Sequence, residues 1–251
     1  MAIPRYQHCI VVGASSGIGE SLAKEIARGG AKVALLARRK DELERVAAAI
    51  KAAGGTVLVY PHDVTHYDEV PGLFDRIVAD LGGLDCIVYA SGVMPKVEEH
   101  EFSFQKDRQM MEINVLGAMA WLNPAGAYFT AKGKGTILGI SSIAGERGRR
   151  GAPVYCTSKA ALTAYLEALR NRLSRYGVSV VTIKPGFIDT VMTKDIKKKG
   201  LLKPISPDVA ARAMLRIATR PSAQGFVPWR WTLVAMIVRN LPSAIFRKMN
   251  I

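Results

Sequence analysis

The chain has 251 residues, with 35 lysines and arginines against 21 aspartates and glutamates, which gives a formal net charge of +14. Its three cysteines cannot form a complete set of intramolecular pairs, and no Pro-, Gly- or Ser-rich linker or repeat divides the sequence. Length, composition and cysteine count therefore exclude a disulfide scaffold and a linker-divided chain. They favour one soluble α/β domain with free thiols in a reducing cytosol.

The N-terminal part predicts a strand, a glycine-rich loop and a helix in that order. Residues Met1–Gln7 lack the apolar stretch of a signal peptide. His8–Val12 is a short apolar run, Gly13-Ala-Ser-Ser-Gly17-Ile-Gly19 follows, and a helical pattern covers Glu20–Ala27. Glycines at this position let the backbone approach a pyrophosphate at the positive end of the helix. A loop that serves packing alone is the other interpretation.

The basic turn after the second strand bears on the choice of nucleotide. Leu36-Ala-Arg38-Arg39-Lys40 contains no acidic residue before Asp41. An acid here would accept hydrogen bonds from the ribose of NAD, whereas two arginines favour the 2′-phosphate of NADP(H). Ser16 in the glycine loop adds a hydroxyl donor. The alternative is a solvated basic turn that precedes a helix.

Further strand-like runs alternate with helical stretches along the chain. The strands are expected at Lys32–Leu36, Thr56–Tyr60, Leu84–Tyr89, Gly135–Ile140 and Val178–Lys184. This alternation predicts a doubly wound parallel sheet covered on both faces, a Rossmann-type three-layer sandwich. A ligand of such a sheet lies beyond the carboxyl ends of the strands, where the glycine loop, Asn114, Ser142 and Pro185 fall.

A tyrosine and a lysine lie four residues apart in Tyr155-Cys-Thr-Ser-Lys159, and the tyrosine is thirteen residues after Ser142. Four residues make about one helical turn, so the two side chains project from one face. A nearby positive charge stabilises a phenolate, and we therefore expect Lys159 to lower the pKa of Tyr155 and make it a general acid or base. Alone, the spacing is also typical of an ordinary surface helix.

These motifs together resemble the short-chain dehydrogenase/reductase family over residues 7–228. The resemblance implies a catalytic set of Asn114, Ser142, Tyr155 and Lys159. In it, Tyr155 donates a proton to a carbonyl oxygen that Ser142 also hydrogen-bonds, Lys159 holds the nicotinamide ribose, and Asn114 positions a water that links Lys159 to solvent.

The same resemblance implies NADP(H) contacts along the strand ends. The residues are Gly13, Ser15, Ser16, Gly17, Ile18, Gly19, Arg38, Arg39, Asp63, Val64, Ala90, Ser91, Gly92, Tyr155, Lys159, Pro185, Gly186, Ile188 and Thr190. One departure is Tyr89-Ala-Ser-Gly92, where the family usually has Asn-Asn-Ala-Gly. The missing asparagines put a local role in bracing the strand in doubt.

Histidines and cysteines indicate no further chemistry. His8, His62, His66 and His100 are scattered singly, without the spacing of metal ligands, so no metal is expected. Cys9 and Cys86 fall in expected buried strands. Cys156, beside Tyr155, is read as a small residue at a crowded helix position rather than as a reactive thiol.

The C-terminal part combines basic and apolar residues. Residues 191–251 contain twelve lysines and arginines against two aspartates. We expect a mobile substrate lid at about residues 190–205 within a catalytic domain of residues 1–228, and an amphipathic basic extension over residues 229–251. The apolar run Trp231–Val238 is too short to span a bilayer, but it suits a segment in a membrane interface that buries Trp229, Trp231, Leu233, Met236 and Phe246. Closure of the core or of a subunit contact is the alternative, and nucleic-acid binding is disfavoured because no recognition motif accompanies the charge.

From about residue 140 onward, the chain also resembles reductases that act on decaprenylphosphoryl-2-keto-erythro-pentofuranose, through Gly145-Glu-Arg-Gly-Arg-Arg150 and Leu241-Pro-Ser-Ala-Ile-Phe-Arg-Lys248. This resemblance implies a keto sugar on a polyprenyl phosphate, met by Arg147, Arg149, Arg150 or the lid lysines. Reduction of a free lipophilic ketone, such as a steroid, 3-ketosphinganine or a 3-oxoacyl chain, is the alternative. A non-catalytic dinucleotide sensor is disfavoured by the complete catalytic set.

The family resemblance also implies association. We expect a homodimer or homotetramer that pairs the helices Phe104–Phe129 and Val154–Tyr176. We expect the protein in the cytoplasm, with any membrane contact peripheral and at the inner face.

Overall fold

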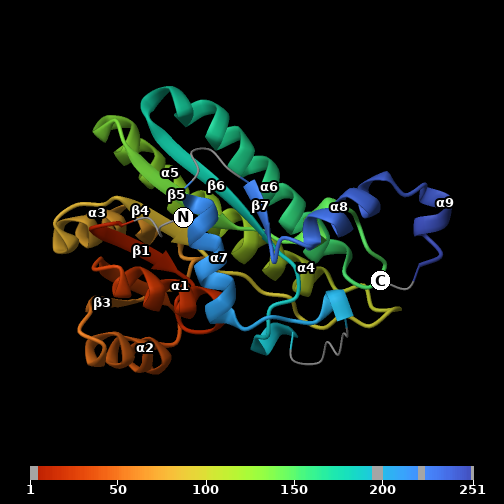
Figure 1. Cartoon of the computed structure of the whole chain (residues 1–251), viewed down its shortest axis with the longest axis horizontal. Helices are drawn as coiled ribbons and strands as arrows, with labels where there is room; N and C mark the ends of the chain where they lie inside the picture. Colours follow the sequence, from red (N-terminus) through yellow and green to blue (C-terminus); the bar gives the residue numbers. More distant parts are fainter. Residues whose placement is uncertain (1–4, 194–199, 220–223, 250–251) are drawn as a thin grey trace.

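The computed structural model describes residues 5–193, 200–219 and 224–249, and its centre is one parallel sheet of seven strands (Figure 1). The strand order is β3-β2-β1-β4-β5-β6-β7. The strands are β1 (His8–Val12), β2 (Lys32–Ala37), β3 (Thr56–Pro61), β4 (Cys86–Tyr89), β5 (Gly135–Ile140), β6 (Val178–Pro185) and β7 (Gln224–Val227). The longer helices are α1 (Gly17–Arg28), α2 (Lys40–Ala52), α3 (Val70–Leu81), α4 (Phe104–Met111), α5 (Gly117–Lys132), α6 (Pro153–Leu173), α7 (Pro207–Ala218) and α8 (Trp231–Asn240), followed by the short α9 (Ser243–Phe246).

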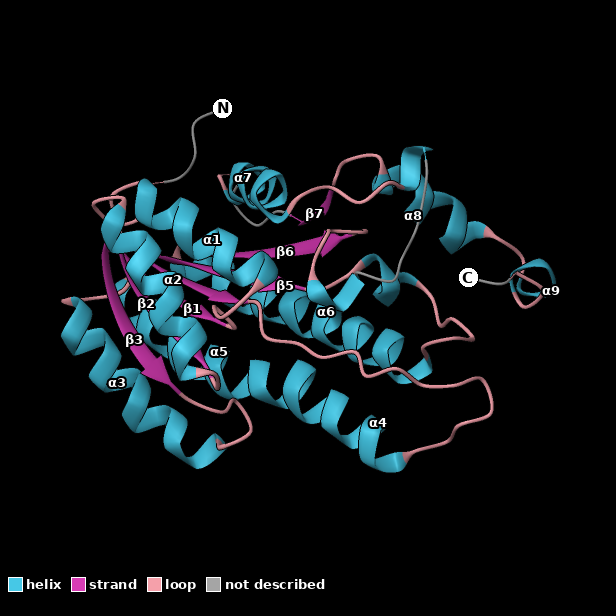
Figure 2. Ribbon diagram, turned by 90° about the horizontal axis from the view of Figure 1, so that it is seen from below, coloured by secondary structure: helices cyan, strands magenta, loops and turns pink. Residues whose placement is uncertain are grey.

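Helices cover both faces of this sheet, as Figure 2 shows. Alternate residues of a strand point to opposite faces, so Cys9 and Val11 of β1 join one core with α1, α2 and α7, whereas Ile10 and Val12 join the other with α3, α5 and α6. Both cores consist mainly of aliphatic side chains, as expected of a parallel sheet that is buried on both sides. The predicted doubly wound fold in a single domain is confirmed.

The strand order reverses beside β1, because β2 leaves on one side of it and β4 lies on the other. A crevice forms beyond the carboxyl ends of strands at such a point, which is where open α/β sheets bind ligands. The loops after β1, β2, β4, β5 and β6 all open on this edge.

The first six strands lie where the alternating pattern predicted them, with end shifts of one or two residues. β7 was not predicted. Burial increases along its four residues, from the exposed Gln224 to the buried Val227, without strand-like alternation. They form a strand because Thr182–Pro185 of β6 offer them a parallel partner.

The helical stretch from Phe104 to Lys132 is one continuous helix with a π-helical turn at Glu112–Leu116. Such a turn inserts an extra residue into the helix and changes the direction in which its side chains point. Asn114 lies in the middle of this turn and is fully buried.

The C-terminal segment packs against the loop that follows the carboxyl end of β6. Trp231 is 5 % exposed, and a Cβ atom added to Gly186 would lie 2.1 Å from its ring. The Trp231 ring also meets Phe187 edge-on, with 5.0 Å between the ring centroids. The expectation that Trp231 enters a membrane is therefore wrong, because this side chain covers the loop after β6.

Arg147 fixes the other end of that segment. Its guanidinium donates hydrogen bonds to the carbonyl oxygens of Val238 and Leu241 and to the Ser243 hydroxyl, and it stacks on the Phe246 ring at 4.2 Å from the centroid. Phe246 is thus partly buried under an arginine rather than free to insert into lipid.

Candidate active site

The glycine loop between β1 and α1 brings the backbone close to neighbouring loops. Gly13 has a φ of +88°, which residues other than glycine rarely adopt. A Cβ atom at this position would lie 2.5 Å from the backbone nitrogen of Ser91. A Cβ on Gly19 would lie 2.1 Å from the Gly13 carbonyl oxygen. These positions therefore require glycine, and the helix N-terminus they expose is suited to a phosphate.

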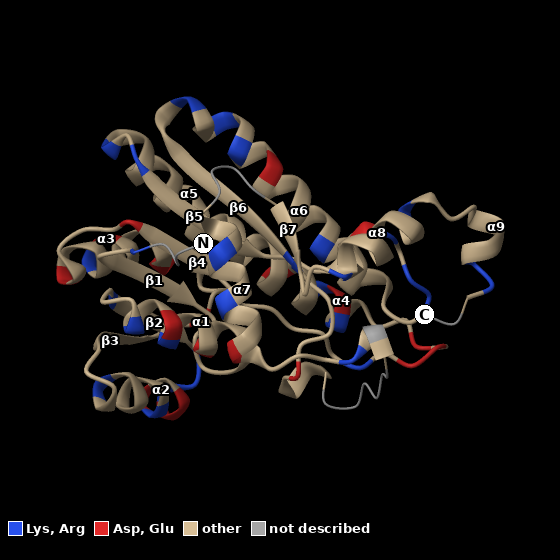
Figure 3. Cartoon of the chain, viewed as in Figure 1, with Lys and Arg blue, Asp and Glu red and all other residues tan. Residues whose placement is uncertain are grey.

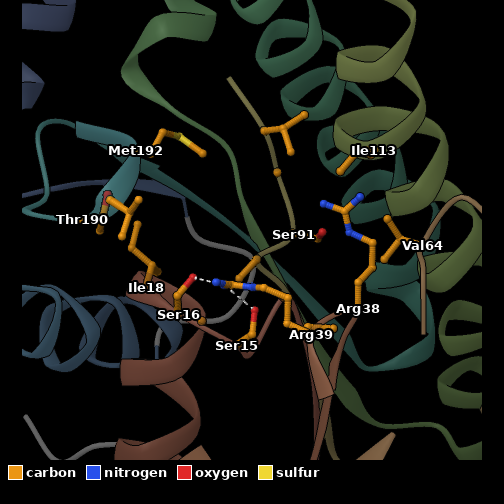
Figure 4. A pocket seen from close by; sticks show the side chains of 18 of the residues that line it. Ser15, Ser16, Ile18, Arg38, Arg39, Val64, Ser91, Ile113, Thr190 and Met192 are labelled. Carbon is orange, nitrogen blue, oxygen red and sulfur yellow. Dashed lines mark hydrogen bonds between the residues drawn. The ribbon is translucent and has the colours of Figure 1, made fainter. Parts of the chain in front are cut away.

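A cavity of about 330 Å³ lies over this loop. It brings together most of the residues predicted to bind the cofactor: Gly13, Ser15, Ser16, Gly17, Ile18, Gly19, Arg38, Arg39, Asp63, Val64, Ala90, Ser91, Gly92 and Thr190. It is also lined by residues that the sequence did not indicate: Ala37, His62, Val93, Ile113, Val191 and Met192. Thr190 and Met192 lie across the cavity from Arg38 and Val64 (Figure 4).

Two arginines border the part of the cavity next to β2. The Arg39 Nη2 atom donates hydrogen bonds of 2.9 Å to the hydroxyls of both Ser15 and Ser16 (Figure 4). Arg38 Nη1 lies 3.7 Å from Asp63 Oδ2. Burial raises the pKa of Asp63, but hydrogen bonds from Thr65 and the charge of Arg38 outweigh it and hold the pKa below its ordinary value. These donors and the glycine loop fit a nicotinamide dinucleotide, whose phosphates need positive groups.

Asn114 is held by three hydrogen bonds at the carboxyl end of β4. Its Oδ1 accepts from the Val93 amide at 2.8 Å, and its Nδ2 donates to the Val93 carbonyl and to Ser158 Oγ, each at 3.0 Å. A Cβ on Gly92 would lie 3.3 Å from both Asn114 Oδ1 and Lys159 Nζ. The side chains of Asn114 and Lys159 therefore both lie next to the backbone of Gly92.

Lys159 is buried on the inner face of α6. Its Nζ donates a hydrogen bond of 3.1 Å to the Ile140 carbonyl at the end of β5. Burial lowers the pKa of Lys159 to about 8. A lysine with this pKa changes charge close to neutral pH.

Tyr155 and Ser142 lie next to Lys159. Ser142 follows β5, and its Oγ accepts a hydrogen bond of 3.0 Å from the Ala144 amide. Lys159 Nζ lies 5.9 Å from the centroid of the Tyr155 ring. The structure thus brings all four predicted catalytic residues to one place.

The expected effect of Lys159 on the pKa of Tyr155 needs correction. Burial raises the pKa of Tyr155, and the groups that act in the opposite direction are the Ser142 hydroxyl and the positive charge of Arg149. Burial therefore outweighs the charges and hydrogen bonds that act on the phenolate, and the pKa of Tyr155 lies above its ordinary value. In this structure Tyr155 is therefore a neutral phenol, suited to donating a proton.

Tyr89 braces strand β4, a role that the missing asparagines at residues 89–90 had put in doubt. Its side chain is fully buried, and its hydroxyl donates a hydrogen bond of 2.6 Å to the Ile113 carbonyl, next to Asn114. A Cβ on Gly117 would lie 2.6 Å from that hydroxyl. The tyrosine thus fixes β4 to the π-helical turn.

The remaining predicted cofactor residues, apart from Tyr155 and Lys159, follow β6. Pro185 ends the strand, Gly186 donates a hydrogen bond of 2.9 Å to the Val227 carbonyl, and Ile188 is buried and bridges to Ile205. Thr190 hydrogen-bonds with Thr193. Lys194 and Lys197–Lys199 of the predicted lid fall outside the residues that the structure describes.

Two negative findings apply to residues 5–193, 200–219 and 224–249. No helix there is both long and apolar enough to cross a membrane. No group of three or more histidines, cysteines and acidic residues there is arranged to hold a metal ion.

Comparison with known proteins agrees with this geometry. The family model for short chain dehydrogenase matches residues 7–200. An uncharacterized oxidoreductase of Myxococcus xanthus is 32 % identical over 248 residues, which cover 98 % of this chain and 97 % of that protein. A short-chain type dehydrogenase/reductase from Mycobacterium marinum superimposes with a TM-score of 0.81 at 27 % identity, over 88 % of this chain and 93 % of that one.

A more distant structure shares the fold. The 7α-hydroxysteroid dehydrogenase in complex with NADH and 7-oxo glycochenodeoxycholic acid has a TM-score of 0.81 at 23 % identity, with 88 % of this chain and 92 % of that chain covered. At this identity the likeness concerns the fold alone.

Proposed function

The chain belongs to the short-chain dehydrogenase family and is an NAD(P)-dependent oxidoreductase of alcohol and carbonyl groups; on that premise we propose that it is an NADP(H)-dependent ketoreductase of a lipophilic or polyprenyl-phosphate-linked keto sugar. The observation that carries the cofactor choice is Arg39, whose guanidinium is held over the glycine loop by Ser15 and Ser16. Arg38 adds a second cation at a position where an enzyme that binds NAD would have a carboxylate to accept hydrogen bonds from the ribose.

The nucleotide would lie along the glycine loop and supply hydride from its nicotinamide. Tyr155 Oη would donate a proton to the carbonyl oxygen of the substrate. The Ser142 hydroxyl would hydrogen-bond the same oxygen, so that developing negative charge meets positioned donors. Lys159 would hold the nicotinamide ribose with its ammonium group, and Asn114 would keep Lys159 in contact with solvent through a water.

Apolar surroundings support a lipophilic substrate. Tyr155 packs in a cluster with Met110, Ala144 and Cys156, next to the partly buried Val93 and Met94. Such surroundings bind hydrocarbon and exclude water from the reacting groups. The sequence resemblance beyond residue 140 favours the lipid-linked keto sugar, and a free lipophilic ketone remains the second candidate because the same apolar cluster would accept it.

We further propose that residues 1–228 form the catalytic domain and residues 229–251 an amphipathic extension that touches the cytoplasmic face of a membrane. Association into a dimer or tetramer would use α4 to α5 and α6. Light scattering at micromolar concentration tests this association, and a monomer would contradict it.

The cofactor assignment is tested with Arg38→Asp combined with Arg39→Ala. Attraction between phosphate and cation becomes repulsion from a carboxylate, so the Kd of NADPH should rise by about 10- to 100-fold while that of NADH changes little. Lys40→Ala, at an exposed position beside the pair, is the control. A wild type that already prefers NADH would overturn the assignment.

The substrate class is tested by NADPH oxidation with a panel of ketones, each offered with and without a phospholipid or polyprenyl-phosphate carrier. We expect turnover of lipophilic ketones and a preference for carrier-linked ones. Turnover of small hydrophilic ketones alone would contradict the proposal.

A further inference from the structure

Three arginines follow Ser142, and the structure gives them different environments. Arg147 is engaged by α8 and α9 through its hydrogen bonds to Val238, Leu241 and Ser243. Arg150 is exposed and lies 3.6 Å from the Glu99 carboxylate. Neither arginine is available at the catalytic tyrosine.

Arg149 differs from both. Its Nε atom is buried without a hydrogen-bond partner, and among the described residues its side chain has no hydrogen bond and no ion pair. A buried N–H without a protein partner costs free energy unless a water or a ligand accepts its hydrogen bond, and Arg149 therefore has a donor to offer. The residue as a whole is half-buried, which leaves the rest of the guanidinium within reach of a bound molecule.

The backbone of Arg149 lies beside the cluster that contains Tyr155. Its carbonyl oxygen accepts a hydrogen bond from the amide of Ala152, and Ala152 packs against that cluster. The positive charge of Arg149 lowers the pKa of Tyr155, in agreement with this position. The carboxylates nearby are already engaged: Glu146 by Lys184 and Arg239, and Glu99 by Arg150.

We propose that Arg149 is a specificity-determining residue that binds an oxyanion, a phosphate ester or a carboxylate, carried by the ketone substrate. The guanidinium offers two parallel N–H donors that match either group. The neighbouring cluster around Tyr155 is apolar, and Glu146 and Glu99 are paired with other cations, so the anion would be bound next to hydrocarbon. This inference rests on the proposed function and specifies which chemical group beside the carbonyl the enzyme recognises.

The test compares matched ketones with NADPH as the reductant: ribulose against ribulose 5-phosphate, and methyl levulinate against levulinate. The first pair detects recognition of a phosphate and the second recognition of a carboxylate. The measured quantity is the ratio of kcat/KM between the charged and the uncharged ketone. Any effect of Arg149 on the pKa of Tyr155 acts on both members of a pair and cancels in this ratio.

Wild type should prefer one charged ketone by about 10- to 100-fold, the range expected for a charge-assisted hydrogen bond. Arg149→Met should reduce this ratio at least tenfold, and Arg149→Lys should restore part of it. Arg150→Met, a matched loss of charge one residue away, should keep the ratio. A wild-type ratio near one for both pairs, or an equal loss in the two methionine variants, would overturn the inference.

A binding measurement separates this inference from the reaction assignment. Calorimetry of ribulose 5-phosphate and of levulinate with the NADP⁺-bound protein, where no reduction occurs, should show a Kd at least tenfold weaker in Arg149→Met for the preferred anion. If no ketone is reduced, those of the lipophilic and carrier-linked panel included, but this difference is found, the proposed function fails and the anion site stands. If ketones are reduced and wild type binds neither anion, the anion site fails and the proposed function stands.

Discussion

At the scale of single residues, the site combines a phenol and an ammonium whose pKa values are both set by burial. The pKa of Tyr155 is raised and that of Lys159 is lowered to about 8, so near neutral pH Tyr155 is neutral and Lys159 is largely charged. This protonation state suits ketone reduction, in which Tyr155 donates a proton.

The first prediction concerns Tyr155 and pH. Tyr155→Phe removes only the hydroxyl, so cofactor affinity should survive while kcat falls by about 10²- to 10⁴-fold. In wild type, ketone reduction should be constant at low pH and decline as pH rises through about 8, because Lys159 loses its charge there and Tyr155 then approaches its own, higher pKa. Steady-state rates over a pH series measure both effects. A Tyr155→Phe variant within a few-fold of wild type would eliminate Tyr155 as the acid.

Tyr89 gives a second prediction at this scale. Tyr89→Phe removes the buried hydrogen bond to the Ile113 carbonyl, so the free energy of unfolding should fall by about 0.5–1.5 kcal/mol. Because Ile113 adjoins Asn114, kcat should fall more than KM rises. Denaturant unfolding and steady-state kinetics measure the two effects, and Tyr60→Phe, which removes an exposed hydroxyl from Asp80, is the control. An unchanged kcat would show that the hydrogen bond serves stability alone.

At the scale of helices and strands, the main finding is the contact between the catalytic loop and the C-terminal helices. Glu146 forms ion pairs with Lys184 of β6, at 2.8 Å, and with Arg239 of α8. Its side chain is 3 % exposed. Arg147 then holds α8 and α9 from the other side. The segment after Ser142 therefore depends on residues more than 90 positions later in the chain.

Arg147→Met tests this contact. Loss of its charge-assisted hydrogen bonds should lower the free energy of unfolding by about 1.5–3 kcal/mol and should make residues 229–249 more sensitive to limited proteolysis. Arg247→Met, an exposed arginine of the same segment, should have neither effect. Equal proteolysis of the two variants would show that Trp231 and the Glu146–Arg239 ion pair hold the segment without Arg147.

The fold and most of the candidate site could be predicted from local sequence. Apolar β-branched runs reveal buried strands, and Gly13 and Gly19 reveal a loop where backbones touch. The π-helical turn at Asn114, the bond of Tyr89 and the short strand β7 could not be predicted, because each depends on a partner that is distant in sequence. For the same reason, the spacing of Arg147, Arg149 and Arg150 did not indicate which one stays unpaired.

At the scale of the whole molecule, one end of the protein is both apolar and basic. The outer face of α8, together with Trp229 two residues before the helix, exposes large apolar side chains: Trp229 (74 %), Leu233 (54 %), Met236 (59 %) and Ile237 (63 %). Basic residues flank these helices (Figure 3): Arg230 precedes α8, Arg239 lies near its end, and Arg247 and Lys248 follow α9. An apolar face of this kind beside cations is typical of contact with an anionic membrane surface.

The corresponding prediction is that wild type binds anionic liposomes at low salt and that high salt weakens the binding. Replacing Leu233, Met236 and Ile237 with glutamine should reduce the affinity at least tenfold, since each large apolar side chain contributes about 1.5–3 kcal/mol when fully buried. These variants are preferable to deletion of residues 229–251, which would also remove Trp231 from Gly186. Cosedimentation measures the effect, with Val209→Gln, an exposed apolar residue of α7, as the control.

Absence of wild-type binding to such liposomes would contradict membrane contact. The exposed face of α8 would then be better explained as a subunit contact, and the substrate as a soluble ketone.

The contact of Arg147 with α8 and α9 also has a consequence for recombination between relatives. Residues 143–152 and 229–249 are complementary surfaces, so exchange of either segment alone would place an unmatched arginine or an unmatched helix in the hybrid. Among the described residues, the loops after β1 and β2, which we propose to bind the nucleotide, form no hydrogen bond or ion pair with α8 or α9. A chimera should therefore have the cofactor preference of the parent that supplies its N-terminal half. It should have the substrate preference of a parent only when residues 143–152 and 229–249 both come from that parent.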